Sequence, residues 1–333
     1  MNVSVLIPAH NAAQTLPGLL AALAQQTKPP LEIIVADDRS TDATRELATQ
    51  SGALVVPVPP PAGPGVARNV AAEAARGELL LFLDADTLPP SDWIERMVNA
   101  FASEGEETVA IWGPYSPPSP EASPLEQLQY WDIAWNQAPT PPYVEVLTSA
   151  NFGVRKVHFV QVGGFPAMQV NEDYVFGSRL ARIGRVRVDR EIPVGHRFRT
   201  RWRDYFLQQR SWAKGIPEMY LKAPRLLVVP QSFRRRRIVL DLLLTATGIL
   251  GLLLTPIWPA AFLGTLAGGS LWWLSTREFA QYLRQQGMGH LPARRFHLVR
   301  NLAWLWGLAE GLVVVIPRLW RTRKEGTPRT PPH

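Results

Sequence analysis

The sequence predicts an α/β domain with a mixed, mostly parallel sheet, followed by membrane helices. In residues 1–115, short apolar segments alternate with amphipathic ones about every ten to fifteen residues, which is typical of βαβ units. Residues 79–83 are apolar throughout, as expected of a strand that is buried on both faces. Long apolar segments begin at residue 238, and their composition is that of membrane helices.

The expected elements of residues 1–115 follow in order. Strands are expected at residues 3–8, 31–36, 53–58, 79–83 and 109–112. The first helix is expected where Leu16, Leu19, Leu20 and Leu23 recur at helical spacing. Later helices are expected to run through Leu47, from Val66 to a stop at Gly77, and through Phe101.

Composition narrows the class of protein further. The chain has 333 residues, with 35 Lys and Arg against 28 Asp and Glu, and a formal net charge of +7. Arginines crowd its second half, which suggests an anionic partner, either a membrane or a nucleic acid. There is no cysteine, which excludes disulfides and cysteine nucleophiles. The chain enters a strand pattern at once, so we expect no cleaved signal peptide.

Two carboxylates follow the central apolar strand, at Asp84 and Asp86. Ligands of open α/β sheets bind at the carboxyl ends of strands, and carboxylate oxygens suit Mg²⁺ or Mn²⁺. The alternative is an ordinary turn, where Asp is common. Asp38 also follows a strand, where it could bind a base or ribose or could merely form a turn.

A glycine-rich segment at residues 63–68 partly matches the dinucleotide-binding fingerprint. It lacks the third glycine, and it follows the third expected strand instead of the first. A nicotinamide-dependent enzyme is therefore disfavoured.

Four segments of this half together resemble glycosyltransferase family 2, which has an A-type nucleotide-diphospho-sugar-binding fold. The segments are Ile7-Pro8-Ala9-His10-Asn11, Val35-Ala36-Asp37-Asp38-Arg39-Ser40-Thr41-Asp42, Arg68-Asn69 and Leu83-Asp84-Ala85-Asp86. The resemblance covers about residues 1–215. It implies a nucleotide-sugar donor, such as a UDP- or GDP-sugar, and inversion at the anomeric carbon.

The resemblance also implies roles for individual residues. The donor-binding residues would be Pro8, Ala9, Asn11, Asp38, Arg68, Asn69, Asp84 and Ala85. Asp38 would contact the base and Arg68 would lie near the diphosphate. Asp84 and Asp86 would be the DxD motif, which holds Mg²⁺ or Mn²⁺ on that diphosphate.

Residues 116–233 are expected to form the acceptor-binding half, with amphipathic interfacial helices. Glu172 and Asp173 begin a helix, where carboxylates are also stabilised by the helix dipole alone. The resemblance implies that Asp173 is the general base, because a hydroxyl acceptor must lose its proton as it attacks, and that Glu172 supports it.

Gln208-Gln209-Arg210-Ser211-Trp212 resembles the Gln-x-x-Arg-Trp motif of membrane-bound family members but departs from its spacing. The resemblance implies that Gln209, Arg210 and Trp212 bind the acceptor. An amphipathic interfacial helix is an equally open interpretation of this basic, aromatic stretch. Nucleic-acid binding is disfavoured because membrane segments follow directly, so no nucleic-acid partner is expected.

Residues 234–325 are predicted to be a membrane domain. Segments 238–254 and 260–274 are expected to form a hairpin (residues 238–274) through a proline-containing joint. A third apolar helix, residues 301–317, contains Glu310 and precedes basic residues. Three spans would place those basic residues outside, so two spans with a re-entrant or interfacial third helix are favoured, and three spans stay open. Residues 326–333 are expected to be a disordered tail.

The sequence thus predicts an inverting, metal-dependent hexosyltransferase in the inner (cell) membrane. It would be multi-pass, with the catalytic domain in the cytoplasm, and would transfer sugar to a lipid or lipid-linked acceptor. The alternatives are a processive polysaccharide synthase and a non-catalytic nucleotide-sugar-binding membrane subunit. A polymerase needs a translocation pore, for which two or three short spans are few.

Overall fold

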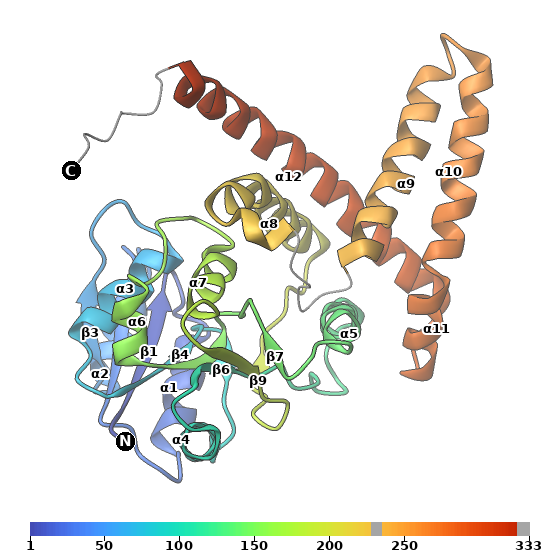
Figure 1. The fold of residues 1–333 in the computed structure, drawn as a ribbon. Helices are drawn as coiled ribbons and strands as arrows, with labels where there is room; N and C mark the ends of the chain where they lie inside the picture. Colours follow the sequence, from blue (N-terminus) through green and yellow to red (C-terminus); the bar gives the residue numbers. More distant parts are fainter. Residues whose placement is uncertain (228–234, 325–333) are drawn as a thin grey trace. The chain divides into compact units, whose positions relative to one another are not determined.

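A computed structural model describes residues 1–227 and 235–324 of the chain (Figure 1). It divides into two compact units, each described here by itself. The first unit contains residues 1–200 together with the segment that begins at Arg225. The second contains residues 201–224 and the helices from Arg235 onward. The predicted tail, residues 326–333, and the predicted boundary near residue 233 lie outside the described residues.

The first unit is built on a mixed sheet, which confirms the predicted fold class. Within the described residues its strand order is β3-β2-β1-β4-β8-β6-β9-β7. The strands are β1 (Val3–Ala9), β2 (Glu32–Asp37), β3 (Leu54–Pro57), β4 (Leu79–Leu83), β6 (Thr108–Trp112), β7 (Tyr143–Val144), β8 (Asn151–Arg155) and β9 (Arg185–Val188). Strands β3, β2, β1 and β4 are parallel, whereas β8 runs antiparallel to both β4 and β6. Strands from residues 1–115 and strands from the predicted acceptor-binding half, residues 116–233, therefore belong to one sheet.

A two-stranded sheet forms beside the end of β4. Strand β5 (Thr87–Leu88) pairs in antiparallel fashion with β10 (Gly195–His196). This pairing brings residues near 196 to the segment that follows Asp86, because His196 is the partner of Thr87.

Helices cover both faces of the large sheet (Figure 1). The helices of the first unit are α1 (Leu16–Ala24), α2 (Thr44–Gln50), α3 (Pro64–Ala74), α4 (Trp93–Glu104), α5 (Pro124–Gln137), α6 (Lys156–Gln161) and α7 (Glu172–Leu180). Side chains alternate along β1, so Val5 and Ile7 join a core with α1 and α4, while Leu6 joins a core with α3, α6 and α7. This alternation buries every residue of the central strand β4, as predicted.

A cluster of phenylalanines fixes α7 against the sheet. Phe82 of β4 stacks on Phe152 of β8 at 4.5 Å between ring centroids. Phe165, in the loop before α7, stacks on Phe176 of α7 at 4.1 Å and meets Phe152 edge-on at 6.0 Å. Aromatic contacts of this kind add to the free energy of simple burial. They hold the start of α7 near the carboxyl end of β4.

The second unit is helical. Its helices are α8 (Trp202–Lys222), α9 (Arg235–Leu254), α10 (Phe262–Ser275), α11 (Arg277–Gln285) and α12 (His290–Lys324). A short 3₁₀ turn at Pro259–Ala261 precedes α10, and a second one, Pro224–Leu227, belongs mostly to the first unit. Helices α9 and α10 form the predicted hairpin, in which a methyl group on Gly251 or Gly268 would collide with the facing helix. Small residues at such contacts are typical of helices that pack in membranes.

Two helices of the described residues are long and apolar enough to cross a membrane. The apolar windows are Arg237–Leu254 in α9 and Pro292–Pro317 in α12. The expected start of the third apolar helix at residue 301 is wrong, because α12 begins at His290. The polar turns before residue 301 are helical because Phe296 stacks on Tyr205 at 4.9 Å and His297 on Phe279 at 4.3 Å.

Candidate functional site

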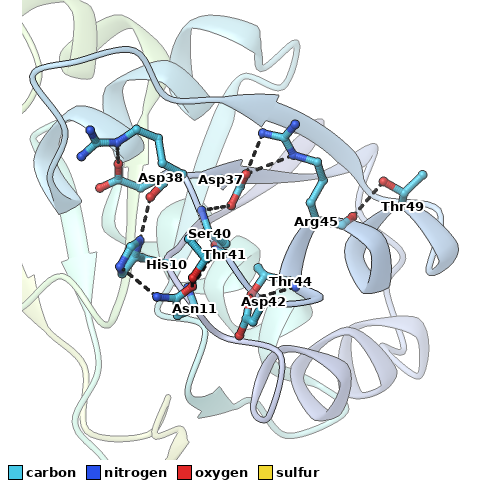
Figure 2. A network of polar contacts seen from close by, with 11 residues as sticks. His10, Asn11, Asp37, Asp38, Ser40, Thr41, Asp42, Thr44, Arg45 and Thr49 are labelled. Atoms are coloured by element: carbon cyan, nitrogen blue, oxygen red, sulfur yellow. Dashed lines mark hydrogen bonds and ion pairs between the residues drawn. The ribbon is translucent and has the colours of Figure 1, made fainter.

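The loops after β1 and β2 are joined by polar contacts (Figure 2). His10 Nδ1 lies 2.7 Å from the backbone oxygen of Asp38. The backbone N–H of Asn11 donates to Ser40 Oγ at 3.0 Å, and Thr41 N–H donates to Asn11 Oδ1 at 2.8 Å. Asn11 adopts a positive φ of 50°, which Asn tolerates better than most residues. The predicted nucleoside-binding residue Asn11 thus holds the two loops together.

Asp37 and Asp38 are adjacent but differ in their partners (Figure 2). Burial opposes ionisation of Asp37, but hydrogen bonds from Ser40 and Arg45 outweigh it and lower its pKa. Asp38 has a buried oxygen, Oδ1, with no hydrogen-bond partner and with Arg39 Nε 3.5 Å away. Of the two carboxylates, Asp38 therefore has the acceptor capacity that a base or ribose would need.

The other donor-side candidates lie at the same edge of the sheet. Pro8 and Ala9 end β1, whose neighbours are β2 and β4. Ala85 lies between the two carboxylates that follow β4. The strand order therefore places all of these residues along the carboxyl edge of the parallel strands, where ligands of such sheets bind.

Arg68 is a buried charge that joins two acidic segments. Its Nη2 donates to Asp84 Oδ1 at 2.6 Å, and its Nη1 donates to Glu172 Oε1 at 2.7 Å. The side chain is only 3% exposed. Burial alone would lower the pKa of Arg68, but Asp84, Glu172 and Asp173 together raise it. The cation therefore ties the end of β4 to the start of α7.

Helix α3 can approach α7 closely because its first turn contains Gly65. A methyl group at this position would lie 2.9 Å from Pro166 O and 3.0 Å from Glu172 Cγ. The glycine-rich segment at residues 63–68 thus allows α3 to pack closely on α7. This packing brings Arg68 within hydrogen-bond distance of Glu172.

Asn69, the neighbour of Arg68, binds the loop before α7. Its Oδ1 accepts from Phe165 N–H at 2.8 Å, and its Nδ2 donates to Phe165 O at 2.9 Å. Both ends of the amide are thus engaged with one backbone unit. Asn69, predicted as a donor-binding residue, is placed so that it orients the segment leading to Glu172.

Asp173 lies in the first turn of α7 with both oxygens hydrogen-bonded. Oδ2 accepts from Ser149 N–H at 3.2 Å, and Oδ1 accepts from Tyr174 N–H at 2.9 Å. Burial and the neighbouring Glu172 raise the pKa of Asp173 to about 7, against the opposing charge of Arg68. A carboxyl group with this pKa can accept a proton near neutral pH, which a general base must do.

Two aromatic residues beside the carboxylates were not among the predicted site residues. His196 Nε2 lies 3.5 Å from Asp86 Oδ1, and its ring lies 4.5 Å from that of Tyr115. Burial, and then the charges of Asp84, Asp86 and Asp173, raise the pKa of the Tyr115 hydroxyl well above its usual value. Tyr115 thus lies within the electrostatic influence of three of the predicted acidic residues, Asp84, Asp86 and Asp173. The position of Tyr115 just after β6 is the sequence feature that could have identified it, because site residues gather at strand ends.

The fit of a divalent cation can be judged from the oxygen atoms at the β4 end. Among residues 1–227 and 235–324, no three His, Asp or Glu side chains form a ready-made metal cage. Asp84 and Asp86 are 32% and 29% exposed, and Arg68 engages only Oδ1 of Asp84. Mg²⁺ usually binds one or two carboxylates together with substrate phosphates and water. The pair therefore fits such an ion when a diphosphate supplies further ligands.

The predicted acceptor residues lie on α8, in the second unit. Gln209 Oε1 accepts a hydrogen bond from Trp304 Nε1 of α12 at 2.8 Å. Arg210 forms an ion pair with Glu310 of α12, with an Nε–Oε1 distance of 3.0 Å. Trp212 is 38% exposed. Gln209 and Arg210 thus hold α8 to α12, and Glu310 is neutralised within an otherwise apolar segment.

Comparison with known proteins is consistent with this geometry. Residues 4–148 match the family model of glycosyl transferase family 2. The glycosyltransferase AglE of Haloferax volcanii is 34% identical over 114 residues, which are 32% of this chain and 38% of AglE. The pre-mycofactocin glycosyltransferase of Mycobacterium tuberculosis is 27% identical over 235 residues, 67% of this chain and 48% of that protein. The chain thus spans less than half the length of these two relatives.

A solved structure matches more of the chain. The mannosyltransferase PcManGT from Pyrobaculum calidifontis, in complex with GDP-Man and Mn²⁺, superposes with a TM-score of 0.61. The match covers 93% of this chain and 87% of PcManGT at 19% sequence identity. At this identity the similarity shows a shared fold.

Proposed function

We propose that this chain, whose residues 4–148 match the model of glycosyl transferase family 2, is a member of that family and moves a sugar from a nucleotide-sugar donor to a lipid or lipid-linked acceptor. The donor would be a UDP- or GDP-sugar, and transfer would need Mg²⁺ or Mn²⁺. The reaction would take place at the cytoplasmic face of the cell membrane, with the anomeric configuration inverted. PcManGT, which was solved with GDP-Man and Mn²⁺, supports the choice of donor class and ion.

One observation carries the proposal: Arg68 binds Asp84 and Glu172 at the same time. The two carboxylates are 88 positions apart in sequence (172 − 84), yet hydrogen bonds of 2.6 and 2.7 Å join them through one buried guanidinium. Asp173 follows Glu172 directly, so a proposed metal ligand and a proposed base share one site. Inverting transfer needs this arrangement, because the leaving group and the incoming nucleophile act on one sugar carbon.

On the donor side, the loops after β1 and β2 would hold the nucleoside. Asp38 would accept hydrogen bonds from the base, beside Pro8, Ala9 and Asn11. Asp84 and Asp86 would hold the cation, with the backbone of Ala85 between them. When bound, the cation would neutralise negative charge that develops on the leaving diphosphate.

On the acceptor side, Asp173 would take the proton of the attacking hydroxyl. The acceptor oxygen forms a bond to the anomeric carbon while the bond from that carbon to the diphosphate oxygen breaks. The electron pair of the broken bond leaves with the diphosphate, and the proton moves to Asp173 Oδ. Glu172, fixed by Arg68, would keep Asp173 oriented and its pKa raised. With one displacement and no covalent intermediate, the configuration inverts.

The second unit supports a membrane acceptor. Helix α9 and the exposed leucines of the α9–α10 hairpin offer an apolar surface that suits lipid. A soluble acceptor would not require such a surface. Gln209, Arg210 and Trp212 of α8 would lie beside the acceptor head group in this proposal.

The experiment compares the purified chain with Asp173→Asn and with Glu73→Gln, an exposed carboxylate of α3 that serves as control. Each is supplied with UDP- and GDP-sugars, Mn²⁺ and a membrane lipid extract. We expect Asp173→Asn to lose at least about 100-fold in transfer, the scale of general-base catalysis, and Glu73→Gln to lose little. Equal turnover in all three would remove Asp173 from its role. A product carrying one sugar supports single transfer, and a polymer would favour the synthase.

A further inference from the structure

Helix α12 has a continuous apolar stripe along one side. Exposed apolar residues recur every three or four positions between residues 298 and 316. They are Leu298, Leu302, Trp306, Ala309, Val313 and Ile316. The stripe extends for about 27 Å at 1.5 Å per residue. By composition and length alone, this helix could cross a bilayer.

The opposite side of α12 packs along α8 over almost the same length. Phe296 stacks on Tyr205, and Trp304 donates to Gln209. Farther along, Gly307 and Gly311 allow α12 to touch the backbone of α8, because a methyl group on either would overlap the oxygen of Arg210 or Lys214. The two helices therefore run side by side in the same direction, as the order of their contacts shows.

Helix α8 is a charged helix. Its exposed residues include Arg203 and Asp204, and also Lys214 and Lys222, which form ion pairs with Glu310 at 3.7 Å and Glu218 at 3.2 Å. A span formed by α12 would draw the attached length of α8 into the hydrocarbon core together with these charges. Ionisable groups in lipid are costly unless they face a partner or water. This pairing therefore disfavours burial of both helices in the core.

The hairpin α9–α10 contacts α12 near the start of α9. Asn301 of α12 lies 3.0 Å from Thr245 Oγ1, next to the buried Asp241, which accepts from Ser275 Oγ at 2.6 Å. Beyond this polar contact the hairpin and the later part of α12 diverge (Figure 1). The hairpin ends in Ile257 and Trp258, which are 84% and 63% exposed.

We propose that α12 does not cross the membrane but lies along its surface, with the stripe from Leu298 to Ile316 in the lipid head-group region and α8 on the aqueous side. The partner is one leaflet of a bilayer. An amphipathic helix in this position buries its apolar face about 5–10 Å deep. The proposal rests on the membrane part of the proposed function and is independent of sugar transfer.

The test uses the absence of cysteine from the chain, which makes each introduced cysteine the only labelling site. Spin labels are placed by Leu298→Cys, Ala309→Cys and Ile316→Cys, and by Thr247→Cys, an exposed position near the middle of α9, as the hairpin control. The full chain is reconstituted in vesicles of phosphatidylcholine and phosphatidylglycerol. Depth is read from the relative accessibility to oxygen and to a water-soluble nickel complex.

We expect the three stripe labels to lie at one shallow depth, within about 5 Å of each other, and the Thr247 label to lie deeper. If α12 crossed the bilayer, the labels at Leu298 and Ala309 would differ by about 16 Å in depth. That result would overturn the surface placement of α12 and would leave the proposed function untouched. If the Thr247 label were also exposed to water, both the proposal and the membrane part of the proposed function would fail. Retained transfer activity in the same samples keeps the catalytic part separate.

Discussion

Arg68→Met is the substitution whose consequences follow most directly from the structure. It keeps an unbranched apolar stem but removes the guanidinium that binds both Asp84 and Glu172. Glu172 is 6% exposed on its side chain, so it would be left as a buried carboxylate without its cation. Breaking a buried ion pair on one side costs about 3–5 kcal/mol. Because Asp84 is one-third exposed and can be solvated, we take the lower end, about 3 kcal/mol.

The assay is thermal unfolding of the full chain in detergent, followed by calorimetry. For a unit of about 200 residues, a loss of about 3 kcal/mol lowers Tm by roughly 6–12 °C. The control is Arg185→Met, which removes an ion pair to Glu107 whose side chains are both more than half exposed. Such surface pairs contribute about 0–1 kcal/mol, so its Tm should fall by no more than about 4 °C.

A double variant separates loss of charge pairing from simple loss of packing. Glu172→Gln added to Arg68→Met removes the unpaired carboxylate, so at least about 1 kcal/mol should be recovered. A second readout is the pH profile, because the charge of Arg68 lowers the pKa of Asp173 and its loss should move the acid limb to higher pH. Equal Tm losses in Arg68→Met and Arg185→Met, with no recovery in the double variant, would refute the reasoning.

Three further predictions concern the same site. The rate of transfer should fall about tenfold per pH unit below about pH 7 and level off above it, because Asp173 acts only when deprotonated and its pKa is about 7. A rate independent of pH between 5 and 7 would contradict this. Asn69→Ala removes two hydrogen bonds to Phe165, so it should cost about 2 kcal/mol in unfolding free energy, with Asn69→Asp recovering only the bond to Phe165 N–H. EDTA should abolish transfer by the wild type, and added Mn²⁺ should restore it. Added Mn²⁺ should not restore transfer in Asp84→Asn or Asp86→Asn. Full activity in EDTA would exclude a required metal.

The fold could be predicted from the sequence because its signals are local. Residues 79–83 are apolar without interruption, and the observed β4 has the same bounds and is buried throughout. Strand β1, expected at residues 3–8, extends one residue farther, to Ala9. Turn residues and helical spacing fix such elements within a few positions, whatever the rest of the chain does.

The site could be predicted only in part, because its contacts join distant segments. No pattern near Arg68 indicates that it would bind Glu172, which is 104 positions away. Gln209 and Arg210 were expected at an acceptor, and the structure engages both with α12. The start of α12 at His290 was also missed, because Phe296 and His297 become helical through packing on α8 and α11, which overrides the polar composition of that segment.

The most direct measurement compares donor binding and transfer in Asp84→Asn and Asp173→Asn. Calorimetric titration with the nucleotide-sugar and Mn²⁺ gives the first quantity, and transfer to membrane lipid gives the second. The account predicts that Asp84→Asn loses donor binding, whereas Asp173→Asn binds the donor within about threefold of wild type and loses transfer by at least about 100-fold. If both variants lost binding equally, or if Asp173→Asn still transferred sugar at the wild-type rate, the assignment of a metal end and a base end to this site would be contradicted.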